Sequence, residues 1–256
     1  MVNFVGAGCG AADLITVRGL RLIKEADVII YAGSLVNPEL LKDAKKDCAV
    51  YDSAKMTLEQ VLAVMKQAEA EGKKTVRLHT GDPSLYGAIR EQMDALSEAG
   101  ISFEVCPGVS SFSGAAASLK AELTLPGVSQ TVILTRMAGR TSVPERESFR
   151  SLAAHHATMA VFLSAGLLKE MEEELLAAGY EPDTPAAIVY KATWPEERIF
   201  RCTVSSLWKT AEEAGIKKTA MILIGGVLGE KEIPGFERSR LYAPDFSTGF
   251  RKGTKD

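Results

Sequence analysis

Residues 78–87 (LHTGDPSLYG) carry the residue types that build a ligand-binding loop. Gly81 lets the backbone approach a ligand closely, and Pro83 fixes the turn around it. Asp82 between them supplies a carboxylate that can orient a bound molecule or help to handle a proton. The same run also fits an ordinary loop in which Asp82 caps the following helix.

The elements on either side of this loop place it at the edge of a sheet. Residues 74–78 have the composition of a buried strand, and Ile89, Met93 and Leu96 recur at helical spacing before Gly100. In a parallel sheet, ligands bind beyond the carboxyl ends of the strands, where such strand-to-helix turns lie. Asp82 is therefore predicted to lie at a ligand-binding edge.

Three glycine-bearing turns follow predicted strands, at residues 6–10, 81–87 and 107–114. If their strands are neighbours in one parallel sheet, all three turns meet at the same edge. This convergence is a stronger indication of a binding site than any one of the motifs alone.

The first of these turns also permits a different interpretation. Residues 6–11 (GAGCGA) fit the glycine fingerprint of dinucleotide-binding folds, which would indicate an NAD-binding oxidoreductase. However, residues 12–15 separate the turn from the next helix, which Thr16 is suited to cap. The second strand, residues 28–31, is followed by Ala-Gly-Ser and not by an acid that could bind a ribose.

Strand and helix patterns alternate along the chain, which predicts an α/β protein with two domains. The first, residues 1–124, is expected to hold a mostly parallel sheet. The second, residues 125–256, is expected to hold a mixed sheet, because residues 198–203 fit an antiparallel partner of the strand at 186–190 across a tight turn. A polar tail follows from residue 234.

Two basic residues lie near a predicted strand end of the second half. Arg136 and Arg140 flank a flexible glycine after the strand at 131–134. Guanidinium groups in such loops can pair with carboxylates of a substrate. Solvated surface charge is the alternative.

Composition excludes several classes of protein. The 256 residues carry a net charge of −3, and the pI is about 5.8, which argues against a broad nucleic-acid or membrane-binding surface. No apolar run reaches the about 18 residues of a membrane span, and the chain begins directly with a strand pattern instead of a signal peptide. Four scattered cysteines and three histidines form no metal-ligand spacing, so we expect a cytoplasmic protein with reduced thiols and no metal site.

Taken together, several runs of the sequence resemble the tetrapyrrole (corrin/porphyrin) methylase family over residues 1–230, with the greatest similarity to members that act in cobalamin biosynthesis. The runs are the glycine-rich opening with DLIT at 13–16, ADV at 26–28, YAGSLV at 31–36, HTGDP at 79–83, PGVSS at 107–111, ILTR at 133–136 with GRT at 139–141, and KATWP at 191–195. Family members usually carry Pro at position 9 and an acid at position 11, where this chain has Cys9 and Ala11.

The resemblance implies two α/β domains with an active cleft between them, S-adenosylmethionine (SAM) as the methyl donor, and a homodimer. Asp82 is the implied catalytic residue. The implied cofactor contacts are Gly81, Asp82, Pro83, Tyr86, Ser110, Ser111, Ser164 and Ala192. The implied acceptor is a small-molecule tetrapyrrole with many carboxylates, for which Arg136, Arg140, Lys191 and Arg198 are the candidate partners. Any cobalt would belong to this substrate.

The resemblance leaves two further questions open. Other members of the family methylate other ring positions of a precorrin or of uroporphyrinogen, and the sequence does not distinguish the methylated carbon. A protein that keeps the methylase fold can also be a binding protein without activity.

Overall fold

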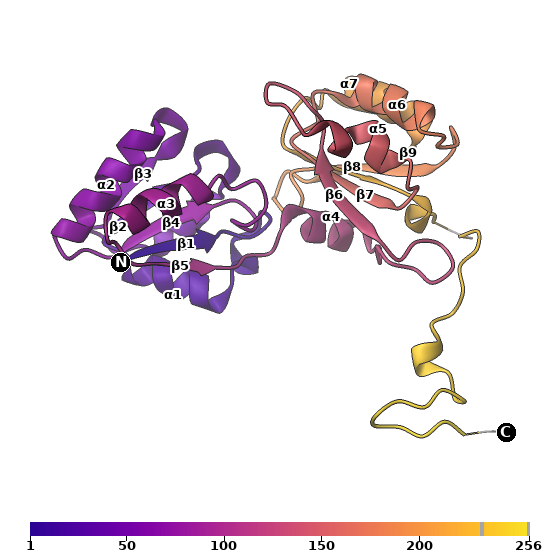
Figure 1. Cartoon of the computed structure of the whole chain (residues 1–256), viewed down its shortest axis with the longest axis horizontal. Coiled ribbons are helices and arrows are strands. Elements are labelled where there is room, and N and C mark those ends of the chain that lie inside the picture. Colours follow the sequence, from indigo (N-terminus) through magenta and orange to yellow (C-terminus); the bar gives the residue numbers. More distant parts are fainter. Residues whose placement is uncertain (231–232, 255–256) are drawn as a thin grey trace. The chain divides into compact units, whose positions relative to one another are not determined.

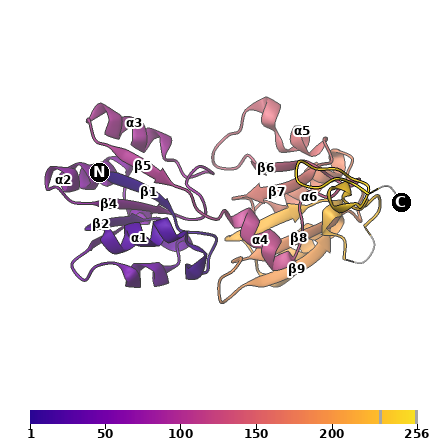
Figure 2. The same cartoon turned by 90° about the horizontal axis from the view of Figure 1, so that it is seen from below.

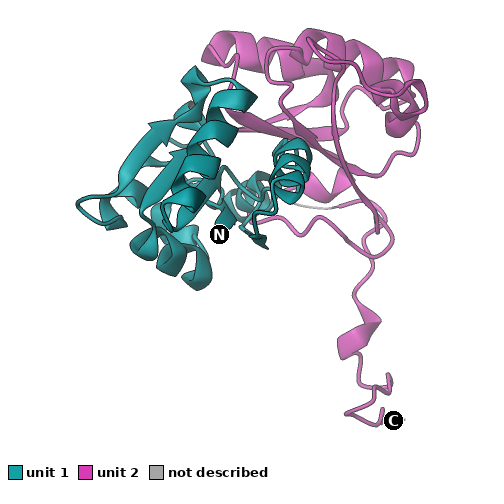
Figure 3. Cartoon of the chain, turned by 60° about the vertical axis from the view of Figure 1, so that its left-hand side comes forward, with its two compact units in different colours: residues 1–119, 190–198 teal, residues 120–189, 199–256 magenta. Residues whose placement is uncertain are grey.

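The structure is a computed structural model that describes residues 1–230 and 233–254. It divides into two compact units (Figures 1 and 3). Unit 1 comprises residues 1–119 and 190–198, and unit 2 comprises residues 120–189 and 199–256. The units are interleaved in sequence, whereas the predicted division at residue 124 is linear, because the segment 190–198 from the second half packs with unit 1.

Unit 1 is built on a five-stranded sheet with the order β3-β2-β4-β1-β5. All its strands are parallel, as predicted. The strands are β1 (Val2–Gly6), β2 (Val28–Tyr31), β3 (Ala49–Asp52), β4 (Thr75–His79) and β5 (Phe103–Cys106). Because β4 and β5 flank β1, the three glycine turns that follow these strands lie at one edge of the sheet, which confirms the predicted convergence.

Helices cover both faces of this sheet (Figures 1 and 2). The helices of unit 1 are α1 (Val17–Glu25), α2 (Leu58–Ala70), α3 (Arg90–Glu98) and α4 (Ser111–Leu119). Val5 and Leu78 point to the face where Ile23 of α1 packs, and Phe4 points to the face where Met65 of α2 packs. Side chains alternate between the faces along a strand, so a sheet covered on both sides needs nearly continuous apolar strands.

Local capping signals in the sequence set where two of these helices begin. Thr16 Oγ1 accepts a hydrogen bond from Gly19 N at 3.0 Å, as its predicted capping role requires. Thr57 and Gln60 form the reciprocal capping box that starts α2. Short 3₁₀ helices occupy Ala12–Leu14, Gly33–Leu35, Pro38–Asp43, Ser53–Lys55, Glu145–Glu147, Val204–Ser206, Gly226–Leu228 and Arg240–Tyr242.

Unit 2 contains a second five-stranded sheet with the order β6-β7-β10-β8-β9. Its strands are β6 (Val132–Arg136), β7 (Thr158–Phe162), β8 (Pro185–Tyr190), β9 (Arg198–Thr203) and β10 (Ala220–Ile224). β6 runs parallel and β10 antiparallel to β7, so the sheet is mixed, as predicted. The connection from β8 to β9 is not the expected tight turn but the segment that packs with unit 1.

The helices of unit 2 are α5 (Phe149–Ala153), α6 (Leu168–Ala177) and α7 (Leu207–Ala214). They lie side by side, with α6 in contact with both others, on one face of the second sheet (Figure 1). Within the described part of the chain, no helix has the length and apolar character needed to cross a membrane.

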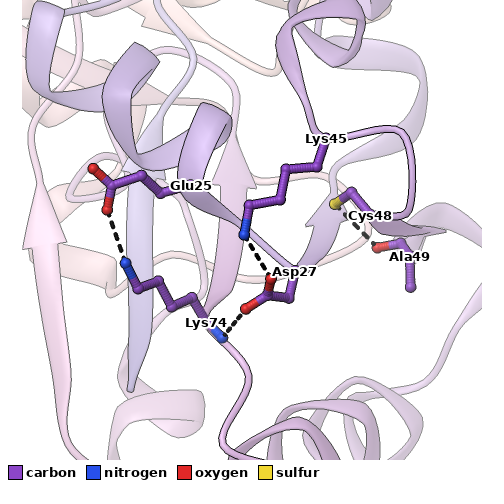
Figure 4. Close-up of polar contacts among 6 residues, drawn as sticks. All are labelled: Glu25, Asp27, Lys45, Cys48, Ala49 and Lys74. Carbon is purple, nitrogen blue, oxygen red and sulfur yellow. Dashed lines mark hydrogen bonds and ion pairs between the residues drawn. The ribbon is translucent and has the colours of Figure 1, made fainter.

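Surface charges connect the segments at the amino-terminal edge of the first sheet (Figure 4). Asp27, just before β2, accepts hydrogen bonds from Lys45 Nζ at 2.7 Å and from the backbone N of Lys74 at 2.8 Å, and Lys74 Nζ contacts Glu25 at 3.0 Å. The hydrogen bonds from Lys45 and from Lys74 N lower the pKa of the Asp27 carboxyl. Such exposed pairs add little stability individually, so their main effect is to align these segments.

His79 ends β4 as a buried side chain, only 4% exposed, with its ring 6.1 Å from that of Phe4. Burial, reinforced by the nearby charge of Arg77, lowers the pKa of the imidazole to about 3. His79 is therefore neutral in the folded protein at neutral pH, which fits a structural residue better than a proton donor.

This buried imidazole predicts how stability depends on pH. Unfolding restores an ordinary pKa of about 6.5, so the unfolded chain takes up a proton as pH falls through that value while the folded chain does not. The stability that comes from this difference in pKa is fully present above about pH 6.5, and it is lost progressively as the pH falls toward 3. When the pH is lowered from about 7.5 to about 5.5, the free energy of unfolding measured with urea should therefore fall by about 1.4 kcal/mol less in His79→Asn than in the wild type.

His155→Asn is the matched control, because His155 is exposed. An equal pH dependence in the wild type and in His79→Asn would contradict a neutral buried imidazole.

Candidate active site

Three glycines bring the turns after β1, β4 and β5 into direct backbone contact. A Cβ added to Gly6 would lie 2.6 Å from both Gly108 Cα and Gly81 O. One added to Gly108 would also collide with Gly81 O and would lie 2.7 Å from Gly6 Cα. We call these three residues the glycine junction. A side chain on Gly6 or Gly108 would separate the turns that form this edge of the sheet, whereas the φ of 61° favours glycine at Gly81.

Backbone hydrogen bonds join the first and second turns of the junction. Gly81 N donates to Gly8 O at 2.8 Å, and Gly8 N donates to Gly81 O at 3.3 Å. Both residues have positive φ angles, 82° for Gly8 and 61° for Gly81, which glycine adopts without a steric penalty. The first turn is therefore shaped by its pairing with the second, and α1 begins only at Val17. Together with Ala32 after β2, this geometry disfavours the dinucleotide interpretation.

Asp82 connects the second and third turns. One carboxylate oxygen, Oδ2, accepts a hydrogen bond from Gly108 N at 2.8 Å. The other, Oδ1, accepts from Ser84 N at 2.8 Å and from the Ser84 hydroxyl. Because α3 starts at Arg90 after its N-cap residue Ile89, the helix-capping alternative for Asp82 is wrong.

These contacts determine the protonation state of Asp82. Partial burial raises the pKa of its carboxyl, but the hydrogen bonds from Ser84 Oγ, Gly108 N and Ser84 N outweigh burial, and the net pKa lies below the ordinary value. The group is thus a stable carboxylate at neutral pH, with both oxygens engaged by the protein. This arrangement suits orientation of the loop better than acceptance of a proton.

The other predicted cofactor contacts of the first half lie on the same two turns. Pro83 is buried, and Tyr86 is 44% exposed in a left-handed conformation with φ 57°. Ser110 is 7% exposed, and Ser111 is the first residue of α4. The structure therefore brings Gly81, Asp82, Pro83, Ser110 and Ser111 together around the glycine junction.

Ala192 lies against the first turn, within unit 1. Its carbonyl oxygen would collide with a Cβ on Gly10, so glycine is required at that position. The next residue, Thr193, accepts a hydrogen bond from Ala11 N at 3.0 Å and lies 3.5 Å from Cys9 Sγ through its own Oγ1. The first turn is thus held from the second half of the sequence.

Cys9 and Ala11 are the two positions at which this chain departs from the usual family residues. Cys9 is 5% exposed, and its Sγ would lie 2.7 Å from a Cβ on Gly114 of α4. The thiol therefore fills a space that exists because residue 114 is glycine. The backbone of Ala11, and not a side chain, makes the hydrogen bond to Thr193.

Two residues that sequence reasoning did not select, Asn37 and Glu197, complete this part of unit 1. Asn37 Nδ2 donates to Gly10 O at 2.9 Å. Glu197 accepts hydrogen bonds from Thr193 N and from Ser118 Oγ, each at 2.5 Å, and so joins the segment 190–198 to α4. Thr193 lay within a motif noted for the family, whereas no local pattern connected Asn37 or Glu197 with a site.

The predicted basic residues of this segment contact aromatic rings. Lys191 Nζ lies 5.2 Å from the ring centroid of Trp194 and 3.6 Å from Glu196. The guanidinium of Arg198 lies 4.8 Å from the ring centroid of Tyr190 and its residue is exposed. A cation over an aromatic face is attracted to it and so is held in place.

Unit 2 holds the remaining predicted residues. Ser164 is fully buried, and its hydroxyl donates to Phe162 O at 2.7 Å and accepts from Met137 N at 2.9 Å. Arg136 donates to three carbonyl oxygens of its own loop, those of Met137, Thr141 and Ser142. Both side chains therefore shape the loops after β6 and β7, whereas Arg140 is exposed in the loop that Arg136 holds.

Over residues 1–230 and 233–254, no group of three or more His, Cys, Asp or Glu side chains is arranged to hold a metal ion. The turns after β1, β4 and β5 form an edge lined by glycines, where their backbone atoms lie close together.

Comparison with known proteins gives a consistent result. The sequence model of the Tetrapyrrole (Corrin/Porphyrin) Methylases matches residues 1–207. The chain is 52% identical to the cobalt-precorrin-4 C(11)-methyltransferase of Methanocaldococcus jannaschii over 254 residues, covering 99% of this chain and 97% of that protein.

Solved structures extend the similarity to three dimensions. One is the X-ray structure of a cobalamin biosynthetic enzyme, cobalt-precorrin-4 methyltransferase, with a TM-score of 0.88, 49% identity, and coverage of 90% of this chain and 96% of that one. Another is uroporphyrin-III C-methyltransferase of Thermus thermophilus in complex with S-adenosylhomocysteine, with a TM-score of 0.75, 26% identity, and coverage of 89% and 98%.

The glycine junction gives a direct test of this geometry. Gly108→Ala should destabilise the protein by about 2–3 kcal/mol, because the new Cβ meets backbone atoms that cannot move aside as a flexible side chain would. Urea unfolding of the full chain measures the loss. Gly249→Ala is the control, since a Cβ there meets no atom within 4 Å. Equal midpoints for the two variants would show that the turns are not closely packed.

Proposed function

Because the chain belongs to the tetrapyrrole (corrin/porphyrin) methylase family, we propose that it transfers the methyl group of SAM to carbon 11 of cobalt-precorrin-4 in cobalamin biosynthesis. The observation that carries the proposal is the 52% identity to the archaeal C11-methyltransferase over nearly the whole of both chains. The runs at 31–36 and 133–141 are among the motifs that resemble family members acting in cobalamin biosynthesis, which agrees with the proposal.

The residues of unit 1 fit SAM. The three residues of its glycine junction carry no side chains, so their backbone groups can approach a ligand. The related structure with bound S-adenosylhomocysteine supports the same class of cofactor. We assign contacts with SAM in unit 1 to Gly81, Asp82, Pro83, Tyr86, Ser110, Ser111 and Ala192. For Ser164, which belongs to unit 2, the contact stays a prediction from the family resemblance.

The bound cofactor would supply a sulfonium methyl group that is already activated for transfer. The protein therefore does not need to build a nucleophile, and alignment of the two reactants is its main task, an effect that can be worth about 7–11 kcal/mol. We propose that Asp82 serves this task, because its carboxylate joins two turns of the cofactor-binding edge and its lowered pKa makes it a poor proton acceptor.

The acceptor ring carries carboxylates that basic side chains can pair. Arg140, Lys191 and Arg198 are the proposed partners. For Arg136, the three hydrogen bonds to its own loop favour an indirect contribution, in which it shapes the loop that presents Arg140.

Three related assignments are part of this proposal. A homodimer is expected from the family resemblance, and size-exclusion chromatography with light scattering tests it. A cytoplasmic location agrees with four free cysteines. Methylation at another ring position is the second candidate function, favoured by the structural similarity to the uroporphyrin-III enzyme but at only 26% identity.

Calorimetric titration of the purified protein with S-adenosylhomocysteine tests the cofactor assignment. We expect about one site per chain and no heat from NAD, because the first turn pairs with the second and β2 lacks an acid for a ribose. Methylation of cobalt-precorrin-4, located by NMR on the product, then tests the ring position. Binding of NAD alone would overturn the cofactor assignment, and methylation at a carbon other than 11 would support the second candidate.

Replacement of one carboxylate oxygen of Asp82 by the NH2 group of asparagine tests the role of this residue. In Asp82→Asn the amide cannot accept hydrogen bonds at both ends, so one connection between the turns is lost. We expect binding of S-adenosylhomocysteine to weaken about 10-fold to 100-fold, as a charge-assisted hydrogen bond disappears. The pH dependence of kcat should keep its shape.

Asp94→Asn, which removes an exposed carboxylate that pairs with Arg90 on α3, is the control. Unchanged cofactor affinity together with loss of the acid limb of the kcat profile would instead assign Asp82 a role as a base.

A further inference from the structure

Arg77 of β4 is a buried cation. Its residue is only 7% exposed, and burial lowers the pKa of the guanidinium to about 10. Among the residues that the structure describes, no carboxylate forms an ion pair with it. A buried charge without a counter-ion is costly, so it is retained only where its hydrogen bonds hold something in place.

The contacts of Arg77 lead from the sheet to the loop before α3. Its Nη1 donates to Ile30 O of β2 at 3.2 Å, and its Nε donates to Gln92 Oε1 of α3 at 3.2 Å. Gln92, itself 4% exposed, uses the other end of its amide to donate to Ala88 O at 2.8 Å. A hydrogen-bonded chain therefore runs from β2 through Arg77 and Gln92 to the backbone of Ala88.

Ala88 lies in a segment whose backbone conformation needs support. Tyr86 and Ala88 both have left-handed conformations, with φ angles of 57° and 49°. Gly87 between them contacts Pro83 O so closely that any Cβ would collide with it. The N-cap residue of α3, Ile89, provides no side-chain cap. Such conformations persist where the surrounding structure fixes them, and they concentrate at functional sites.

We propose that the Arg77–Gln92 pair positions the loop 82–88 for cofactor binding by holding Ala88 in its left-handed conformation. Both are positioning residues, because they act through the loop and not on the reacting atoms. The inference rests on the proposed function, since this loop carries Asp82, Pro83 and Tyr86. The chemistry requires an amide at position 92, which must accept from Arg77 and donate to Ala88 at the same time.

The variant Gln92→Glu separates positioning from stability. A carboxylate still accepts from Arg77, and gives it the counter-ion it lacks, but it cannot donate to Ala88 O. We expect a thermal midpoint at or above that of the wild type, with about tenfold weaker binding of S-adenosylhomocysteine, because one buried hydrogen bond to the loop is lost. KM for SAM should rise by a similar factor, and kcat should change less.

Gln67→Glu is the matched control. Gln67 is an exposed residue of α2 that donates to Glu71 at 3.0 Å, so the same chemical change there should leave cofactor affinity unaltered. Wild-type affinity and KM in Gln92→Glu would overturn the proposal. A lower thermal midpoint together with weaker binding of S-adenosylhomocysteine in Gln92→Glu would also overturn the proposal, because Gln92 would then have a general structural role.

Hydrogen exchange tests the loop independently of any cofactor. Amides of residues 84–89 should exchange faster in Gln92→Glu than in the wild type, while those of α2 should not change. Arg77→Lys provides a second variant if Gln92→Glu does not fold, because an ammonium group cannot reproduce the two-directional guanidinium contacts. Unchanged exchange in this loop would contradict the proposal. If the wild type binds no S-adenosylhomocysteine, the proposed function fails, yet exchange still tests the Arg77–Gln92 pair.

Discussion

The structure of unit 1 depends on the close approach of three backbone segments at Gly6, Gly81 and Gly108. Each glycine lies at or just beyond the carboxyl end of one of three adjacent parallel strands. A Cβ on Gly6 or Gly108 would collide with the backbone of the neighbouring turns, and Gly81 has a φ of 61°, which favours glycine. Asp82 reinforces this approach, since its carboxylate connects the second turn to the third. Parallel strands bring their carboxyl ends to one edge, and small residues there let backbone groups face a ligand. The close packing of these turns and the cofactor site that we propose at them thus depend on the same three glycines.

The central strand β4 carries two buried ionisable side chains, Arg77 and His79. A neutral buried imidazole at its end and a buried guanidinium two residues earlier both cost free energy that apolar residues would not. The guanidinium is compensated by hydrogen bonds to Ile30 O and Gln92, which extend to the loop before α3. Buried polar groups of this kind specify one conformation more strictly than an apolar core does. The strand that leads into the loop 82–88 is therefore also connected, through Gln92, to the backbone of Ala88 in that loop.

The side chains predicted for the site differ in their hydrogen bonds and in their exposure. The hydroxyl of Ser164 and the guanidinium of Arg136 are engaged by backbone groups of their own unit. Arg140 and Arg198 are exposed. Residue type alone suggested the same role for both arginines of the loop after β6. Hydrogen bonding, which depends on the path of that loop, separates a residue that shapes the loop from one that it presents.

The sequence by itself determined the α/β class, the parallel first sheet, the mixed second sheet and the convergence of three turns, because periodicity, capping residues and glycines act over short distances along the chain. It also identified the family, since the motifs are read as local strings. Only the tertiary structure decided that the segment 190–198 packs with the first unit, that Asn37 and Glu197 hold its turns, and that Gln92 connects Arg77 to Ala88. Those partners lie far apart in sequence or on different elements, and no local pattern specifies which donor will meet which acceptor once the strands have assembled.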